Sequence, residues 1–284
     1  MQDSKTISAL LTLLGDEDNK IVKTAQAKLL EIGPAAVPEL RSRYEGQPLT
    51  IKVRLREIIN QLQPRDLADN FRKLESEEVK NNLDLEEALF TIARVGYPNL
   101  KCDFYRQELD RLSCRIGKEL SRWQVIDEHT IVDAVIDTIF RKNEFRGDTQ
   151  DYYNPQNSFI NRVIDRKMGS PILLSALVLL ISRRLGLPFR AVGMPAHCIL
   201  SYPGESDPIF VDPFYGGKII TRDDCYEFLT GAGFGFVEEY LEPINDKELV
   251  IRILRNLINV YHRQHNNSRV QELRTYLAIV ARRY

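Results

Sequence analysis

The chain has 284 residues, of which 43% are hydrophobic and 28% charged, and 39 basic against 40 acidic side chains give a formal net charge of −1. This composition is typical of a soluble globular protein and excludes general disorder. A nearly balanced charge also argues against nucleic acid or an acidic membrane surface as the partner. The length exceeds that of a typical single domain, so we expect several units.

Targeting and cysteine patterns favour a cytoplasmic protein. The N-terminal residues 1–5 carry an acid and lead into an amphipathic pattern, unlike a signal sequence. The longest apolar run, 172–181, is shorter than the roughly 20 residues that span a bilayer. The cysteines lie far apart without a C-x-x-C pair, so we expect reduced thiols, no metal site and no cofactor; they are Cys102, Cys114, Cys198 and Cys225.

Residues 1–63 show a helical pattern with an internal repeat. Apolar positions such as Leu10 and Leu29 recur thirty residues later as Leu40 and Ile59. Two stacked helical hairpins would bury a shared face. The segment resembles HEAT-type repeats, although its period is shorter than their roughly 40–47 residues. An ordinary four-helix cap is an equal alternative, and either one offers a packing or docking surface.

A polar stretch, residues 64–80, is predicted to be a linker. Residues 81–145 then form a helical subdomain, in which the apolar spacing predicts three helices. These helices are expected at 83–94, 104–120 and 126–140. The last unit, residues 244–284, is predicted to be a helical hairpin that weakly resembles a tetratricopeptide unit.

Residues 146–243 hold the predicted core. Ser170 and Pro171 are typical of a helix start, and residues 172–185 are apolar nearly all round, which indicates a buried helix. Short strand patterns joined by tight turns follow and indicate an antiparallel meander. They lie at 189–193, 197–202, 209–214 and 218–221. The predicted fold class is therefore α+β.

A histidine and an aspartate lie on neighbouring strands of this meander. With the turn centred between Gly204 and Glu205, His197 falls directly opposite Asp212, and cross-strand partners share a face. An aspartate there could orient the histidine, as in a catalytic triad. Strand alternation puts Cys198 on the other face, which makes it a poor nucleophile.

Several short motifs follow one another between residues 83 and 220. They are Leu85-Glu86-Glu87-Ala88, Arg94-Val95-Gly96-Tyr97-Pro98, Asn157-Ser158-Phe159, Arg166-Lys167-Met168-Gly169-Ser170-Pro171, Gly186-Leu187-Pro188, Met194-Pro195-Ala196-His197 and Asp212-Pro213-Phe214 followed by Gly216-Gly217. Together these motifs closely resemble the SirB family of transglutaminase-like proteins. The resemblance implies a papain-like or transglutaminase-like core, in which a helix N-terminus packs against an antiparallel sheet.

The resemblance also implies where a nucleophile should be. In true transglutaminases and related thiol proteases, a cysteine two residues after a glycine starts the helix. Counted from Gly169, the equivalent residue here is Pro171, which has no nucleophilic atom. His197 and Asp212 carry over as the histidine and aspartate of the triad. Ser170 lies where a helix dipole would favour an oxyanion, but a serine is also the natural N-cap.

We therefore expect a noncatalytic scaffold that binds a protein or peptide partner, through the His197–Asp212 cleft or the flanking helical repeats. The alternative is an amide or ester hydrolase, or an acyltransferase, that uses Ser170, His197 and Asp212. A purely architectural His–Asp pair is also consistent with the pattern. Binding or structural residues around the site are Asn157, Gly169, Pro171, Pro195, Pro213 and Phe214.

Overall fold

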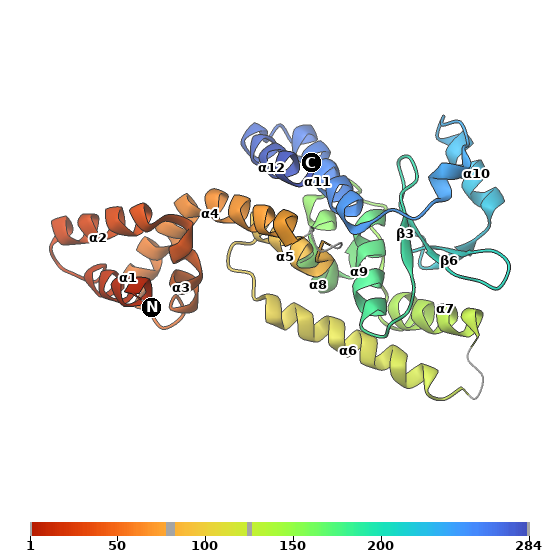
Figure 1. Ribbon diagram of the computed structural model, residues 1–284, viewed down its shortest axis with the longest axis horizontal. Coiled ribbons are helices and arrows are strands. Elements are labelled where there is room, and N and C mark those ends of the chain that lie inside the picture. Colours follow the sequence, from red (N-terminus) through yellow and green to blue (C-terminus); the bar gives the residue numbers. More distant parts are fainter. Residues whose placement is uncertain (1, 78–82, 124–126, 283–284) are drawn as a thin grey trace.

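The structure, a computed structural model, describes residues 2–77, 83–123 and 127–282. It is mostly helical with one small antiparallel sheet, which confirms the predicted α+β class. Figure 1 shows an elongated molecule with the N-terminal helices at one end and the sheet near the other. None of the described helices combines the length and apolar character needed to cross a membrane.

The elements follow one another in chain order. The α-helices are α1 (Gln2–Leu13), α2 (Asn19–Ile32), α3 (Val37–Ser42), α4 (Leu49–Glu77), α5 (Leu85–Gly96), α6 (Cys102–Leu120), α7 (Glu128–Ile136), α8 (Ile160–Arg166), α9 (Pro171–Arg183), α10 (Arg222–Gly231), α11 (Asp246–Arg263) and α12 (Asn267–Val280). The shorter helical segments are η1 (Gly33–Ala36), η3 (Asp137–Lys142), η4 (Pro155–Ser158) and η5 (Glu238–Leu241). The strands are β1 (Arg146–Gly147), β2 (Met168–Gly169), β3 (Arg190–Val192), β4 (Ile199–Tyr202), β5 (Ile209–Asp212) and β6 (Lys218–Ile220).

The N-terminal helices α1 to α3 and the first half of α4 enclose a hydrophobic core of their own. Leu14, Leu29, Leu40 and Leu55 are fully buried in it. Asp18 caps α2 by accepting a hydrogen bond from the Lys20 amide at 2.8 Å. The paired helices therefore bury a shared face in this part of the chain.

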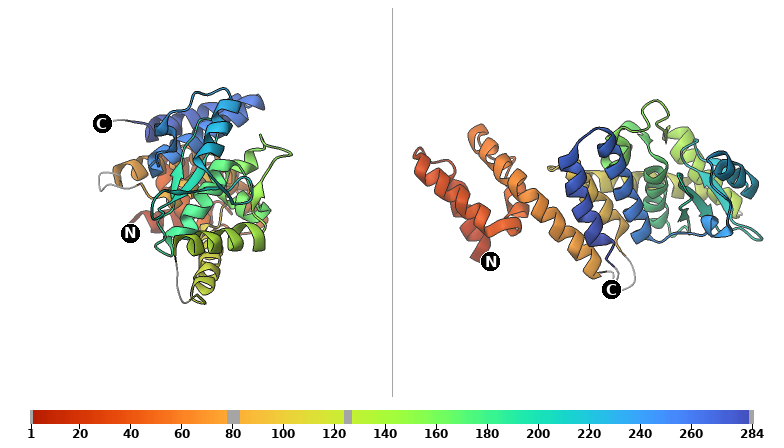
Figure 2. Two further views of the ribbon diagram at one scale, coloured as in Figure 1. Left: turned by 90° about the vertical axis from the view of Figure 1, so that its right-hand side faces the viewer. Right: turned by 90° about the horizontal axis from the view of Figure 1, so that it is seen from above.

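The predicted linker at 64–80 is wrong for most of its length. Helix α4 continues through Pro64 to Glu77, while residues 78–80 lie outside the described part of the chain. Leu67, Phe71 and Leu74 recur at helical spacing and are buried in the main core, and Phe71 stacks on Tyr276 with ring centroids 4.9 Å apart. The polar residues around this apolar stripe led to the prediction of a linker. Figure 2 shows the C-terminal hairpin lying beside the second half of α4.

Helix α9 is the centre of the main core. Every residue from Pro171 to Ser182 is buried, as its apolar sequence predicts, and Gly186 at φ +67° follows the helix end. Helices α6, α8 and α11 pack against it, and strands β3 and β4 cover another side. The sheet order β3-β4-β5-β6, antiparallel throughout, confirms the predicted meander.

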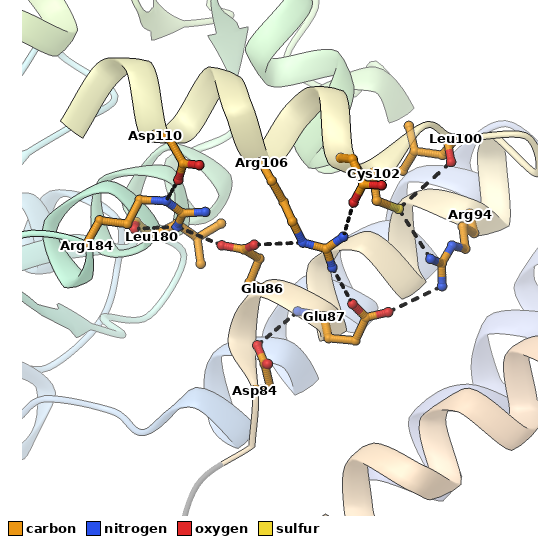
Figure 3. A network of polar contacts seen from close by, with 11 residues as sticks. Asp84, Glu86, Glu87, Arg94, Leu100, Cys102, Arg106, Asp110, Leu180 and Arg184 are labelled. Atoms are coloured by element: carbon orange, nitrogen blue, oxygen red, sulfur yellow. Dashed lines mark hydrogen bonds and ion pairs between the residues drawn. The ribbon is translucent and has the colours of Figure 1, made fainter. Parts of the chain in front are cut away.

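Ion pairs fasten the helices around α9. The Glu86 carboxylate accepts a hydrogen bond from Arg106 Nε at 3.1 Å and pairs with Arg184 Nη1 at 2.7 Å, so it links α5 to α6 and to the end of α9 (Figure 3). Glu87 joins Arg94 to the same Arg106. These side chains are only partly exposed, and such a shared carboxylate stabilises more than an isolated surface pair.

Candidate functional site

His197 and Asp212 form a short hydrogen bond, with His197 Nε2 and Asp212 Oδ2 2.7 Å apart. His197 lies two residues before β4, and Asp212 ends β5. The predicted direct opposition is wrong, because the register pairs Leu200 with Val211 and is two residues away from the expected one. The two side chains are diagonal neighbours on one face, which still lets them meet.

Asp212 orients the histidine through both of its oxygens. Its Oδ1 accepts hydrogen bonds from the backbone amides of Phe214 (2.9 Å) and Tyr215 (3.4 Å), while Oδ2 faces His197. A carboxylate that only accepts hydrogen bonds places the imidazole proton on Nε2. The Nδ1 atom of His197 is then left with a free lone pair.

Aromatic rings enclose the imidazole. The ring of Phe228, from α10, lies 4.9 Å from that of His197, and the rings of Phe214 and Tyr215 lie 6.3 Å away. The His197 and Asp212 side chains are only 5% and 7% exposed. Ala196 just before the histidine has φ +60°, a conformation that costs a non-glycine residue energy and is common at functional sites.

Ser170 occupies the N-cap position of α9, but its side chain does not cap the helix. The backbone has the extended N-cap conformation (φ −74°, ψ 160°), yet the side chain makes no capping hydrogen bond. Its Oγ is buried without a partner among the described residues. The expected cap is therefore wrong, and the difference lies in the direction of the side chain alone. Pro171 occupies the first helical position, as predicted.

A short parallel strand pair holds the start of α9 in place. Gly147 of β1 pairs with Gly169 of β2, and its amide donates to the Phe214 carbonyl at 3.0 Å. A Cβ on Gly147 would lie 2.4 Å from the Phe214 ring, so only glycine permits this approach. The pair ties the beginning of α9 to the segment that follows Asp212.

Asn157 lies behind Ser170 and supports it. Its carbonyl accepts a hydrogen bond from the Ser170 amide at 3.0 Å, and its Oδ1 accepts one from Arg166 at 2.8 Å. Arg166 also binds Asp148 at 3.0 Å. Although burial acts to raise the pKa of Asp148, hydrogen bonds from the Asp151 amide and Arg166 lower it below its usual value. Asn157 is therefore a structural neighbour of the site.

Two pockets meet at His197. The first, of about 340 Å³, is lined by Tyr152, Ser170, Pro171, Ile172, Met194, Ala196, His197, Cys198, Arg252, Arg255 and Asn256. The second, of about 280 Å³, is lined by Met194, His197, Asp212, Tyr215, Lys218, Ile220, Asp224, Cys225 and Phe228. We call them the arginine pocket and the aromatic pocket. Both share Met194 and His197, so the imidazole separates two adjacent binding spaces.

Sequence reasoning missed the contribution of α11 to this site. Arg252, Arg255 and Asn256 were assigned to the separate unit 244–284, yet they line the arginine pocket. The signal was present in the sequence, because Arg252 and Arg255 are three residues apart on an amphipathic helix and therefore lie on one face of it. Pro195, Pro213 and Phe214 lie close to the pair in sequence, and of these Phe214 touches the imidazole.

The thiols near the site are poorly suited to catalysis. Burial raises the pKa of Cys198 and of Cys225 to about 11, which keeps both protonated at neutral pH. Cys198 belongs to the main core together with Leu200, and it also contributes to the lining of the arginine pocket. Within residues 2–77, 83–123 and 127–282, no group of three or more candidate ligands could hold a metal ion.

Comparison with known proteins gives the family. A UPF0162 protein of Xylella fastidiosa (strain 9a5c) is 30% identical over 189 residues, which cover 63% of this chain and 65% of that protein. A UPF0162 protein of Vibrio cholerae is 28% identical over 151 residues (52% and 54%), and human F-box only protein 21 is 28% identical over 185 residues (61% and 28%). The matched region thus spans less than two thirds of each relative. No solved structure matches. Residues 103–255, more than half of the chain, match the transglutaminase-like superfamily, to which this protein therefore belongs.

Proposed function

We propose that the chain is a noncatalytic transglutaminase-like protein that binds a protein or peptide segment in the cleft around His197. The observation that carries this proposal is Pro171 at the first position of α9, where the resemblance places the nucleophilic cysteine. The resemblance to the SirB family refines the same assignment. The paired helices at both ends of the chain supply further docking surface, and a cytoplasmic location is consistent with reduced thiols.

The cleft supports binding without chemistry. His197 separates two pockets of complementary character, one with arginines and one with aromatic rings, so an extended segment could place one side chain in each. The arginine pocket, at about 340 Å³, lies within the usual range of about 300–1,000 Å³ for ligand recognition, and the aromatic pocket, at about 280 Å³, lies just below it. The thiols offer little support for a nucleophile beside His197, because burial raises the pKa of Cys198 and Cys225, and Cys102 and Cys114 lie on α6 and line neither pocket.

A second candidate, an amide or ester hydrolase or an acyltransferase using Ser170, has one observation in its favour. The Ser170 hydroxyl makes no capping bond and lines the same pocket as His197. Burial opposes this role, because Ser170 is only 3% exposed and an acyl carbon must approach within bonding distance of its Oγ. Without a partner, the hydroxyl is also not activated by hydrogen bonding to the imidazole.

Covalent labelling separates the two candidates. A fluorophosphonate probe and an iodoacetamide probe would be incubated with the wild type, with Ser170→Ala and with His197→Ala, and the labelled sites would be mapped by mass spectrometry. The noncatalytic proposal expects no labelling that depends on His197. Fluorophosphonate on Ser170 that disappears in His197→Ala would overturn it.

The same Ser170→Ala variant carries a stability test. A capping hydroxyl contributes about 1 kcal/mol, whereas removal of a buried hydroxyl without a partner relieves a desolvation cost of about 1–3 kcal/mol. Since Ser170 Oγ has no partner among the described residues, we expect an unchanged or raised free energy of unfolding in urea. A loss of about 1 kcal/mol would show that the hydroxyl caps α9 after all.

A further inference from the structure

The arginine pocket has an unbalanced positive charge. Arg252 and Arg255 line it from one face of α11, and its lining includes no aspartate or glutamate. Arg252 is partly neutralised, because its Nε donates to Glu248 at 3.0 Å and its Nη1 to the Met194 carbonyl at 3.4 Å. Arg255 forms no ion pair with any residue in the described part of the chain. The lining therefore includes one arginine, Arg255, that is exposed and has no acidic partner among the described residues.

The start of α9 reinforces the same sign of charge. Ser170, Pro171 and Ile172 line the pocket, so the positive end of the helix dipole lies at its wall. The Ser170 hydroxyl is 97% buried, since only 3% of the residue is exposed, and its Oγ has no partner. The Ser170 hydroxyl is therefore a buried hydrogen-bond donor without an acceptor, at a helix start and in the same pocket lining as Arg255.

The neighbouring aromatic pocket has a different chemistry. It contains the carboxylates of Asp212 and Asp224 together with Lys218, and its walls are Tyr215 and Phe228. An anion would be repelled by these acids, whereas an apolar or aromatic side chain would contact the rings. Only the space on the α11 side of His197 is therefore suited to negative charge.

We propose that the arginine pocket is a carboxylate-binding subsite, which takes an acidic group of the bound peptide beside His197. A single uncompensated guanidinium fits a monoanion, and its planar fork fits the two oxygens of a carboxylate. This inference rests on the proposed peptide-binding function. It adds the chemical class of the ligand: a carboxylate in the arginine pocket, with an apolar side chain next to it in the aromatic pocket.

Peptide display tests both statements separately. Random dodecapeptides would be displayed in two libraries, one with a free C-terminus and one with the C-terminus fused, and selected on the wild-type protein. We expect enrichment of Asp or Glu at a fixed distance from an apolar residue. Enrichment only in the free library would identify a C-terminal carboxylate, and enrichment in both would identify a side chain. Peptides without any acidic preference would overturn the carboxylate subsite but leave peptide binding intact. No enriched peptide at all would overturn both.

Affinity measurements then assign the preference to the pocket. Binding of one selected peptide would be measured by fluorescence polarisation for the wild type, Arg255→Gln and a control, Arg274→Gln. The control makes the same charge change at an exposed position of α12 that does not line the pocket. We expect Arg255→Gln to weaken binding about tenfold, the effect of one charge-assisted hydrogen bond, and the control to leave it unchanged.

A matched peptide completes the test. Replacement of the acidic group by its amide should weaken binding to the wild type by the same factor and should add little in Arg255→Gln, because the two partners act on one contact. Independent, additive effects of the two changes would overturn the subsite. Arg252→Gln provides a second variant at the same pocket, and a raised salt concentration should reduce the wild-type affinity toward that of Arg255→Gln.

Discussion

Removal of the Asp212 carboxylate should lower the free energy of unfolding by more than the loss of its packing contacts alone would. Asp212 is 5% exposed and accepts three hydrogen bonds, one from the His197 imidazole at 2.7 Å and two from the backbone at 2.9 and 3.4 Å. Asp212→Ala leaves the imidazole N–H and the Phe214 amide without an acceptor. Two buried donors at about 1–3 kcal/mol each predict a loss of about 2–6 kcal/mol.

Asp212→Asn should destabilise the protein less than Asp212→Ala and should change the tautomer of His197. The asparagine oxygen can still accept from the Phe214 amide, while its NH₂ group faces His197 Nε2 and needs an acceptor there. The imidazole proton therefore moves from Nε2 in the wild type to Nδ1 in the variant. The loss of charge assistance predicts a decrease of about 1 kcal/mol in the free energy of unfolding.

Urea unfolding and NMR measure these effects. The free energy of unfolding would be compared for the wild type, both Asp212 variants and Asp207→Ala, an exposed aspartate in the loop of the same hairpin that should change stability by less than about 0.5 kcal/mol. Long-range ¹⁵N correlation spectra report the imidazole tautomer. A wild-type histidine protonated at Nδ1, or an Asp212→Ala variant as stable as the control, would refute the assigned hydrogen bonds.

Further predictions concern the surrounding structure. Gly217→Ala should cost about 2–4 kcal/mol in urea unfolding, since φ is +75° and the new Cβ would lie 2.5 Å from a ring of η3, whereas Gly216→Ala at φ +70° has open space and should cost about 1 kcal/mol; equal losses would contradict the clash. Iodoacetamide at pH 8 should label exposed Cys114 and spare Cys198, as mass spectrometry would show, because burial raises the pKa of Cys198 to about 11. This raised pKa stabilises the fold fully below the unfolded thiol pKa, and the contribution is lost as the pH rises through about 11. Glu86→Ala should lower the free energy of unfolding in urea by about 1–3 kcal/mol, and by less at high salt. A loss that does not depend on salt would argue against the ion pairs in Figure 3.

The sequence was sufficient for the parts of the site that depend on local patterns. A continuous apolar run behind a serine and a proline predicted α9, and alternating strands with tight turns predicted the meander. His197 and Asp212 were correctly placed on one face although the register was wrong. The loop between β4 and β5 covers residues 203–208, the same residues that the predicted strands leave between them, but its centre lies between Glu205 and Ser206, one residue beyond the assumed centre. The error was two residues, and an even shift keeps every side chain on its face.

Nonlocal contacts could not be predicted in this way. Strands β1 and β2 have two residues each, too few for any periodicity, and their pairing depends on the Phe214 ring that covers Gly147. Helix α4 passes through a proline because its second half packs on α12, far away in the sequence. Arg252 and Arg255 reach the site because α11 packs against α9. Each of these features depends on tertiary packing, which overrides local propensity.

The connections of the His197–Asp212 pair give it a structural role that does not depend on catalysis. Asp212 fixes the amides of Phe214 and Tyr215, and the Phe214 carbonyl in turn accepts from Gly147 of the strand pair that precedes α9. The pair therefore joins the end of β5 to the start of the central helix. His197, held by the same carboxylate, forms the wall between the arginine and aromatic pockets. The binding function that we propose needs this connection whether or not a cysteine begins the helix.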